Sequence, residues 1–305
     1  MIKTLSIVFL GESMKKKNLA ILLSIFLVAC GGGQNQVNKN QNGLITNVQE
    51  KLILQSSDLT PISESWQTIT MLTTRSILSV QESINQQVAN PGRLMLWAGF
   101  TKGEGFGKFK EYVDLASQTN RFEYAYIYDE LFWENINNTA QTAIGYNEDV
   151  VLDAAKYAIS KNLKPAIVIL PNVILDEKFA LKEINTYDTI GIDVYPSILV
   201  TKDTGTCKYN NNVLTNLLYC SQKKLRDLGF TGKIWYVYQA FGIKGEDNKI
   251  FTDNLNLQKE TINDAANFID GIAPFGLYLG NDELTKEPYL IPGKNSNFES
   301  LVNFK

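Results

Sequence analysis

The sequence predicts an α/β fold in which parallel strands alternate with helices and close into a (β/α)8 TIM barrel. From residue 93 onward, apolar runs rich in β-branched and aromatic residues alternate with segments of helical periodicity. This alternation is typical of parallel strands that are covered by helices. Several runs also end in a polar residue, namely Asp129, Asp193, Gln239 and Asn281. A barrel explains these endings, because the carboxyl ends of its strands converge where active sites are built.

Seven runs are predicted to be strands, and they cover residues 51–54, 93–99, 122–129, 166–170, 189–196, 233–242 and 275–282. The eighth strand is expected within residues 43–60 or as an irregular segment. No glycine-rich phosphate loop follows any of these runs, which argues against a dinucleotide-binding fold.

Helices are expected between the strands, at residues 61–88, 107–118, 147–161, 176–184, 212–228 and 257–269. Pro61 favours the start of the first helix, and the turn Asn90-Pro91-Gly92 favours its end. Asn147 is the expected N-cap of the third helix, because its side chain accepts hydrogen bonds from free backbone N–H groups.

The first 29 residues are predicted to be a signal peptide. A basic segment, Met14–Lys17, precedes a short apolar run, Leu19–Ala29, which is too short to span a membrane. The segment Leu27-Val28-Ala29-Cys30 resembles the bacterial lipobox, which implies a lipid anchor on Cys30 and delivery to the outer membrane of the cell envelope. The alternative is an ordinary buried cysteine. Residues 30–43 are predicted to be a flexible tether, and residues 44–305 the barrel domain.

Composition narrows the classes of partner and chemistry. The net charge is −3, and residues 1–29 contain four lysines and one glutamate, so the remainder carries −6. An acidic domain without basic clusters argues against a nucleic-acid partner. The chain has no histidine, which excludes His-dependent triads and His-ligated zinc, so acid–base chemistry falls chiefly to carboxylates. No cofactor and no metal site are predicted, although carboxylate-only Ca²⁺ sites remain open.

Two cysteines remain after Cys30, and these are Cys207 and Cys220. In an exported protein they are expected to form a disulfide, with two free thiols as the alternative.

The aromatic run Phe122–Tyr128 ends abruptly in Asp129-Glu130, and Trp133 follows three residues later. Ionised carboxylates are costly to bury, so they rarely follow a core strand without a partner or a task. The alternative is that the pair caps the next helix, since acids favour helix N-termini. Glu130 is the first choice for a catalytic acid and Asp129 the second.

From residue 122 onward, the order of motifs resembles the clan A glycoside hydrolases, a group of TIM-barrel enzymes. Asp129-Glu130 takes the place of the pair that ends strand four in that group, which implies that Glu130 is the acid/base. The segment Gly191–Pro196 resembles strand six, and Phe275–Asp282 resembles the last strand. Strand seven departs from the pattern, because Gln239 stands where the nucleophilic glutamate is expected.

An amide at this position leaves three hypotheses, since a retaining mechanism needs an ionised carboxylate. In the first, the enzyme inverts, with Glu130 as acid and Asp193 or Asp282 as base at a separation of about 6.5–9.5 Å. In the second, the substrate assists and Asp129-Glu130 act as an acid and an orienting group. In the third, the barrel is catalytically silent and only binds glycans.

The resemblance implies a carbohydrate substrate or ligand, and the residues expected to contact it are Trp133, Tyr195, Tyr238, Gln239, Asn281 and Asp282. Trp133 is the expected sugar platform, because aromatic faces stack on the apolar faces of sugar rings. The alternatives are core roles for the aromatics, a buried structural carboxylate for Asp193 and a structural amide for Gln239. A further hypothesis is an envelope-maintenance protein whose partner is another protein, which an exposed apolar patch would favour.

Overall fold

The computed structural model describes part of the chain, and the described residues are 50–56, 69–73, 79–98, 105–128, 148–196, 204, 206–239, 241–243, 248–275 and 290–292. All of them belong to one compact unit, Gly43–Lys305. None of the helices in these ranges is long and apolar enough to cross a membrane.

Eight parallel strands form a closed barrel, which confirms the predicted fold class. In chain order and in barrel order they are β1 Glu50–Ser56, β2 Ile69–Thr73, β3 Arg93–Trp97, β4 Phe122–Tyr128, β5 Lys164–Ile169, β6 Thr189–Val194, β7 Lys233–Gln239 and β9 Gly271–Phe275. The barrel closes where β9 pairs with both β7 and β1.

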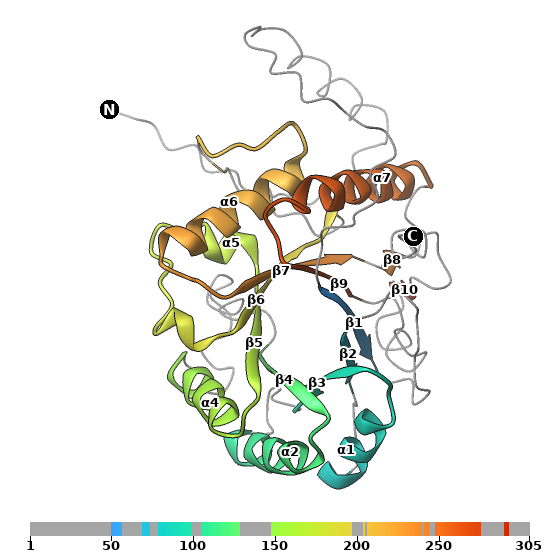
Figure 1. Cartoon of the computed structure of the whole chain (residues 1–305). Coiled ribbons are helices and arrows are strands. Elements are labelled where there is room, and N and C mark those ends of the chain that lie inside the picture. The colour runs from blue at the N-terminus through green and yellow to red at the C-terminus, as the bar shows by residue number, and fades with distance from the viewer. Residues whose placement is uncertain are drawn as a thin grey trace, which may run out of the picture. The chain divides into compact units, whose positions relative to one another are not determined.

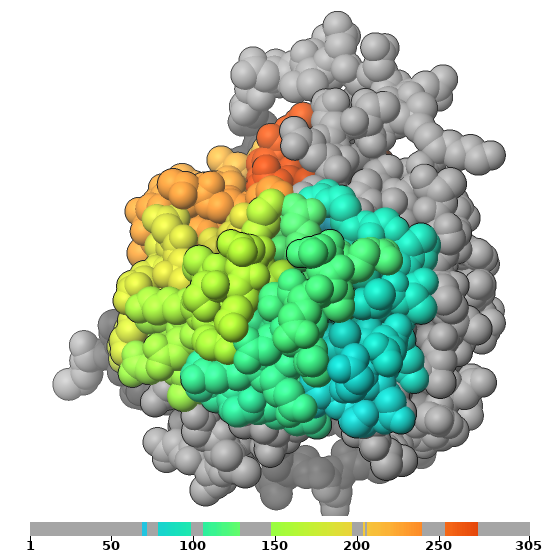
Figure 2. Space-filling model, turned by 60° about the horizontal axis from the view of Figure 1, so that its bottom comes forward, coloured from blue at the N-terminus to red at the C-terminus, as the bar shows by residue number. Residues whose placement is uncertain are grey.

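The described helices lie outside the barrel strands (Figure 1). They are α1 Val80–Val88, α2 Gly105–Thr119, α4 Glu148–Ser160, α5 Pro171–Ile174, α6 Val213–Asp227, α7 Asn248–Ala265 and the short 3₁₀ helix η1 Ile184–Thr186. Figure 2 shows one outer face, on which α1, α2 and α4 lie side by side. Two short strands, β8 Phe241–Ile243 and β10 Leu290–Pro292, form a separate antiparallel pair.

The helix predicted over residues 61–88 is wrong, because the structure has the strand β2 at Ile69–Thr73 and a helix only from Val80. Ser79 begins that helix with a capping box, in which its side chain and that of Glu82 each bond the other's backbone N–H. The strand missing from the prediction is therefore β2. Residues 43–60, where it was expected, contain β1.

Two further elements differ from expectation. The helix predicted at residues 176–184 is absent, because Asp176 accepts a hydrogen bond from the Lys178 backbone N–H and forms a turn. Glu183, with a φ of 45°, then takes a left-handed conformation that no α-helix can contain. The last barrel strand occupies Gly271–Phe275, which is earlier than the predicted range 275–282. The pattern did not indicate a strand here, because the segment contains a glycine and a proline, and both residues are uncommon in strands.

Strand alternation divides the core into two layers. The layer inside the barrel consists of Ile69, Met71, Met95, Tyr124, Tyr126, Ala166, Val168, Trp235, Val237 and Ala273, with Trp97 and Tyr195 packed against them. The intervening residues face the helices and form the larger outer layer. Gly191 shows how tightly the interior is packed, since a Cβ on this residue would lie 2.9 Å from Val168 Cγ2 and 3.0 Å from Val237 Cγ2.

The N-terminal end of the barrel carries an ionic cluster around Tyr124. Glu123 accepts hydrogen bonds from Arg93 at 2.5 and 2.9 Å and from Lys164 at 2.7 Å. Lys233 Nζ lies 2.7 Å from the Tyr124 hydroxyl, and all three cations lie within 5.8 Å of the Tyr124 ring centroid. Arg93, Lys164 and Lys233 each begin a strand, so this cluster joins β3, β4, β5 and β7.

Candidate functional site

The C-terminal end of the barrel brings Asp193 and Gln239 onto neighbouring strands, β6 and β7. Asp193 lies two positions after Gly191 in β6, so both residues face the same side of the strand. A Cβ built on Gly191 would point toward the interior side chains of Val168 and Val237. Gln239 likewise follows the interior residue Val237 by two positions. Both side chains therefore point into the barrel, where Asp193 is 3% exposed and Gln239 is 0% exposed.

Two aromatic residues lie at the same end. Tyr195 directly follows β6 and packs against the interior layer, two positions beyond Asp193. Trp97 is the last residue of β3, and its ring centroid lies 5.6 Å from that of Tyr126. Trp97 was not among the predicted site residues, because it lies within the predicted strand 93–99, where a tryptophan fits the core equally well.

Tyr238 is placed differently from the other predicted site residues. It neighbours Gln239 in β7 and therefore points to the opposite side of the strand, into the layer between strands and helices. Its side chain is fully buried, and its ring packs 5.7 Å from that of Tyr236. Burial raises the pKa of the Tyr238 phenol far above its usual range, so the group stays neutral.

The strand β4 ends at Tyr128, the residue immediately before Asp129-Glu130 in the chain. Its pairing with β5 shifts register between Tyr126 and Tyr128, as in a β-bulge. Bulges are common at barrel rims, where they redirect side chains. The inward direction of Tyr126 therefore does not fix the side of the strand on which Tyr128 lies.

Six predicted site residues fall outside the described ranges, and they are Cys30, Asp129, Glu130, Trp133, Asn281 and Asp282. Their roles stay predictions. Within the described ranges, no group of three or more Cys, Asp or Glu residues is arranged to hold a metal ion.

Charge is distributed unevenly along the described barrel strands. Their four basic residues, Lys51, Arg93, Lys164 and Lys233, all occupy the first or second position of a strand. Asp193 is the only acidic residue in the C-terminal half of any of these strands. In the described strands, the basic residues thus lie at the N-terminal end together with Glu123, and Asp193, Gln239 and Trp97 lie at the C-terminal end.

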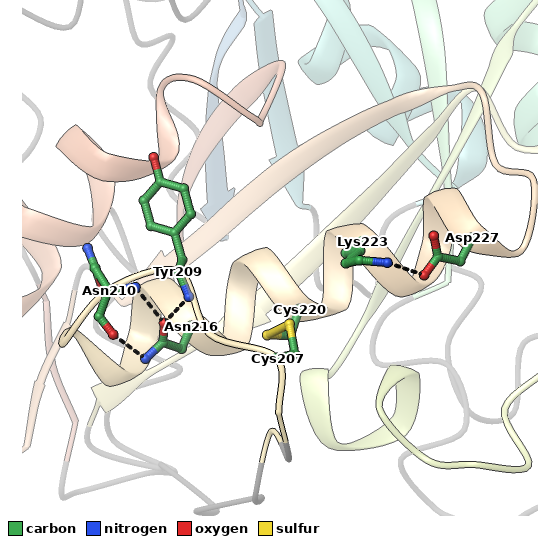
Figure 3. The surroundings of a disulfide bond; sticks show 7 residues. All are labelled: Cys207, Tyr209, Asn210, Asn216, Cys220, Lys223 and Asp227. Atoms are coloured by element: carbon green, nitrogen blue, oxygen red, sulfur yellow. Dashed lines mark hydrogen bonds and ion pairs between the residues drawn. A yellow bond between two sulfur atoms is a disulfide. The ribbon is translucent and has the colours of Figure 1, made fainter. Parts of the chain in front are cut away.

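The predicted disulfide between Cys207 and Cys220 is formed, with the two Cα atoms 5.9 Å apart. It ties the segment that precedes α6 back onto that helix (Figure 3). Asn216 fixes the same segment, because its Oδ1 accepts from the backbone N–H groups of Tyr209 at 2.8 Å and Asn210 at 3.0 Å. The Tyr209 ring packs against the rings of Tyr219 in α6 and of Phe268, with centroids 5.0 and 5.2 Å away, and it is 41% exposed.

The chain matches no protein-family model and no curated protein. Among solved structures it is similar to a type I 3-dehydroquinate dehydratase from Clostridium difficile, at 9% identity over 84% of this chain and 95% of that one, with a TM-score of 0.43. A xylanase from Bispora sp. MEY-1 is similar at 12% identity over 68% and 74% of the two chains, with a TM-score of 0.42. An endo-β-1,4-mannanase from Thermotoga petrophila is similar at 10% identity over 76% and 69%, also with a TM-score of 0.42. The fold itself follows from the closed ring of paired strands.

Proposed function

We propose that this protein is a glycoside hydrolase that binds a poly- or oligosaccharide at the C-terminal end of its barrel. The observation that supports this most is the inward placement of Asp193 and Gln239 on the neighbouring strands β6 and β7, with aromatic rings at the same end. Carboxylates for acid–base work, amides for hydroxyl groups and aromatic faces for sugar rings are the groups that glycan cleavage needs.

In the proposed reaction, Glu130 donates a proton to the leaving oxygen as the general acid. Asp193 acts as the base that activates water for an inverting displacement. Asp282 is the other candidate for the base, and Asp129 would orient the acid. Gln239 serves as a hydrogen-bonding group for the substrate, because an amide cannot form the covalent intermediate of a retaining enzyme. Trp133 and Asn281 are proposed further contacts of the sugar.

The direct test compares the wild-type protein with Glu130→Gln on a panel of soluble polysaccharides, with products separated by chromatography. The wild type is expected to release oligosaccharides, and Glu130→Gln to release none while keeping its circular dichroism spectrum. Undiminished turnover in Glu130→Gln would refute the assignment of the acid. Gln239→Glu is expected to give no gain in rate, because an inverting enzyme does not use that position as a nucleophile.

A second candidate function is a non-catalytic glycan-binding barrel. The amide of Gln239 favours it, because the position where the resembling enzymes place their nucleophile cannot act as one here. This protein would bind oligosaccharides in calorimetry and would release no product over long incubations.

We further propose that Cys30 is lipidated and anchors the protein in the bacterial envelope, at the outer membrane. The lipobox-like segment Leu27–Cys30 supports this proposal. Cys30→Ala is expected to abolish incorporation of labelled palmitate and to release the protein from the membrane fraction. Equal labelling of the variant would contradict it.

A further inference from the structure

Trp97 has a distinct place within the barrel interior. Ten apolar residues of the described interior layer are buried, and Trp97 and Tyr195 are the two partly exposed apolar residues packed against them. Trp97 ends β3 and Tyr195 follows β6, and two strands, β4 and β5, separate these elements in the barrel order. The two rings therefore project from different walls of the C-terminal end.

A buried glutamine holds the main chain of Trp97. Gln87, from helix α1, is 2% exposed. Its Oε1 accepts from the Trp97 backbone N–H at 2.9 Å, and its Nε2 donates to the Trp97 carbonyl oxygen at 3.1 Å. The same Nε2 lies 3.1 Å from Ser83 Oγ, so the buried amide is well satisfied. One side chain thus fixes both backbone polar groups of the residue at the end of β3.

The indole itself is supported by Tyr126, which is 5% exposed and whose ring is tilted by 31° to it. Gln87 thus fixes the main chain from which the indole projects, and the Tyr126 ring packs against the indole. Holding a partly exposed ring in one orientation is what a binding site requires, because less ordering entropy is then lost when a ligand binds.

We propose that Trp97 is a stacking platform for a sugar ring, that Gln87 is its positioning residue, and that the glycan is neutral rather than anionic. This inference rests on the proposed function, and it adds a sugar-binding residue and a class of substrate. The flat face of an indole matches the apolar C–H face of a pyranose ring. In the described strands the basic residues lie at the opposite end, and the acidic residue in their C-terminal halves is Asp193, whose negative charge would repel the carboxylates of uronic acids.

The test is calorimetric titration of the full-length protein with xylo-, manno- and cello-oligosaccharides, and with oligogalacturonate as the anionic comparison. Trp97→Ala is expected to weaken the best neutral ligand about 10-fold, and Trp97→Phe to weaken it less. Tyr209→Ala is the matched control, because it removes an exposed aromatic ring from the segment beside α6 and is expected to leave affinity unchanged.

In the wild-type background, Gln87→Leu is expected to weaken the affinity for the best neutral ligand about 3-fold. In the Trp97→Ala background, adding Gln87→Leu is expected to cause no further loss of affinity. A merely structural role would lower affinity equally in both backgrounds. If Gln87→Leu does not fold, Gln87→Glu replaces it, since it keeps the acceptor for the Trp97 N–H and loses the donor to the carbonyl.

The outcomes separate this inference from hydrolysis. Wild-type affinity in Trp97→Ala overturns the platform and leaves the proposed hydrolysis standing. Trp97-dependent binding without any product supports the platform and refutes hydrolysis. Tighter binding of oligogalacturonate than of every neutral ligand overturns the substrate class, and a wild type that binds none of the panel overturns both proposals.

Discussion

At the residue scale, the direction of each side chain decides which predicted residues meet. Asp193, Tyr195 and Gln239 could be predicted because they end apolar runs, and strand ends converge in a barrel. Tyr238 could not be separated from Gln239, because which of two neighbours points inward depends on strand pairing, which the sequence does not show. Trp97 was missed for the same reason, since a tryptophan in an apolar run fits either side of a strand.

Asp193 is predicted to be the catalytic base, so Asp193→Asn removes a proton acceptor and keeps the volume of the side chain. The expected result is a fall in kcat of about 100-fold or more, with little change in KM. Steady-state kinetics on the best substrate of the panel check this, with Asp282→Asn assayed in parallel. If only Asp282→Asn loses activity, the role of base passes to Asp282.

Gly191 is predicted to tolerate no side chain, because its missing Cβ would meet Val168 and Val237 at 3.0 Å or less. Gly191→Ala is expected to lower the free energy of unfolding by about 1–3 kcal/mol. Urea denaturation measures this. Gly107→Ala is the control, because nothing lies within 4 Å of that Cβ position in helix α2, and it is expected to be neutral or slightly stabilising. Equal effects of the two substitutions would contradict tight packing at Gly191.

At the element scale, the helices α2, α4 and α6 were predictable to within two residues, whereas α7 begins nine residues before the predicted 257–269 and the short strand β2 was missed. Helix α4 shows an apolar face at helical spacing, including the buried residues Val151, Ala154, Ala155 and Ala158. The strand β2 has only five residues, a length at which helical and extended patterns cannot be told apart. Its hydrogen bonds to β1 and β3 decide its conformation, and those are tertiary contacts.

The disulfide is predicted to stabilise the segment before α6. Cys207 and Cys220 are 13 residues apart, and closing a loop of this size contributes about 3 kcal/mol by restricting the unfolded chain. Adding dithiothreitol should lower the Tm of the wild type and leave that of a Cys207→Ser/Cys220→Ser variant unchanged. A wild-type Tm that does not change when dithiothreitol is added would contradict a stabilising disulfide.

The ionic cluster is predicted to make stability fall in acid. The hydrogen bond from Arg93, assisted by Lys164 and opposed by burial, lowers the pKa of Glu123 from 4.5 to about 2. Because the folded pKa lies below the unfolded one, this stabilisation is complete above about pH 4.5 and is lost as the pH falls toward 2.

Urea denaturation at pH 6 and pH 3 tests this prediction. Between these values, the wild type should lose about 1 kcal/mol more than Glu123→Gln, allowing for solvent screening of a side chain that is 30% exposed. Parallel pH profiles for the two proteins would show that the carboxylate of Glu123 is not the group responsible.

At the scale of the whole barrel, the two ends of the described strands carry different sets of residues. The basic strand starts and Glu123 join neighbouring strands at the N-terminal end, where residues of a TIM barrel usually serve stability. The C-terminal end carries Asp193, Gln239, Trp97 and Tyr195. The closed barrel could be predicted from alternating runs, but its closure by β1 and β9 could not, because pairing between the first and last strands leaves no local pattern.

The most direct test of catalysis at the C-terminal end is the release of product from the polysaccharide panel by two matched variants. Glu130→Gln and Glu123→Gln each replace one carboxylate by an amide, the first just after β4 and the second at its start. At neutral pH, Glu123→Gln is expected to release product at the wild-type rate, and Glu130→Gln to release none. Product from Glu130→Gln at the wild-type rate, or loss of product only in Glu123→Gln, would contradict the account.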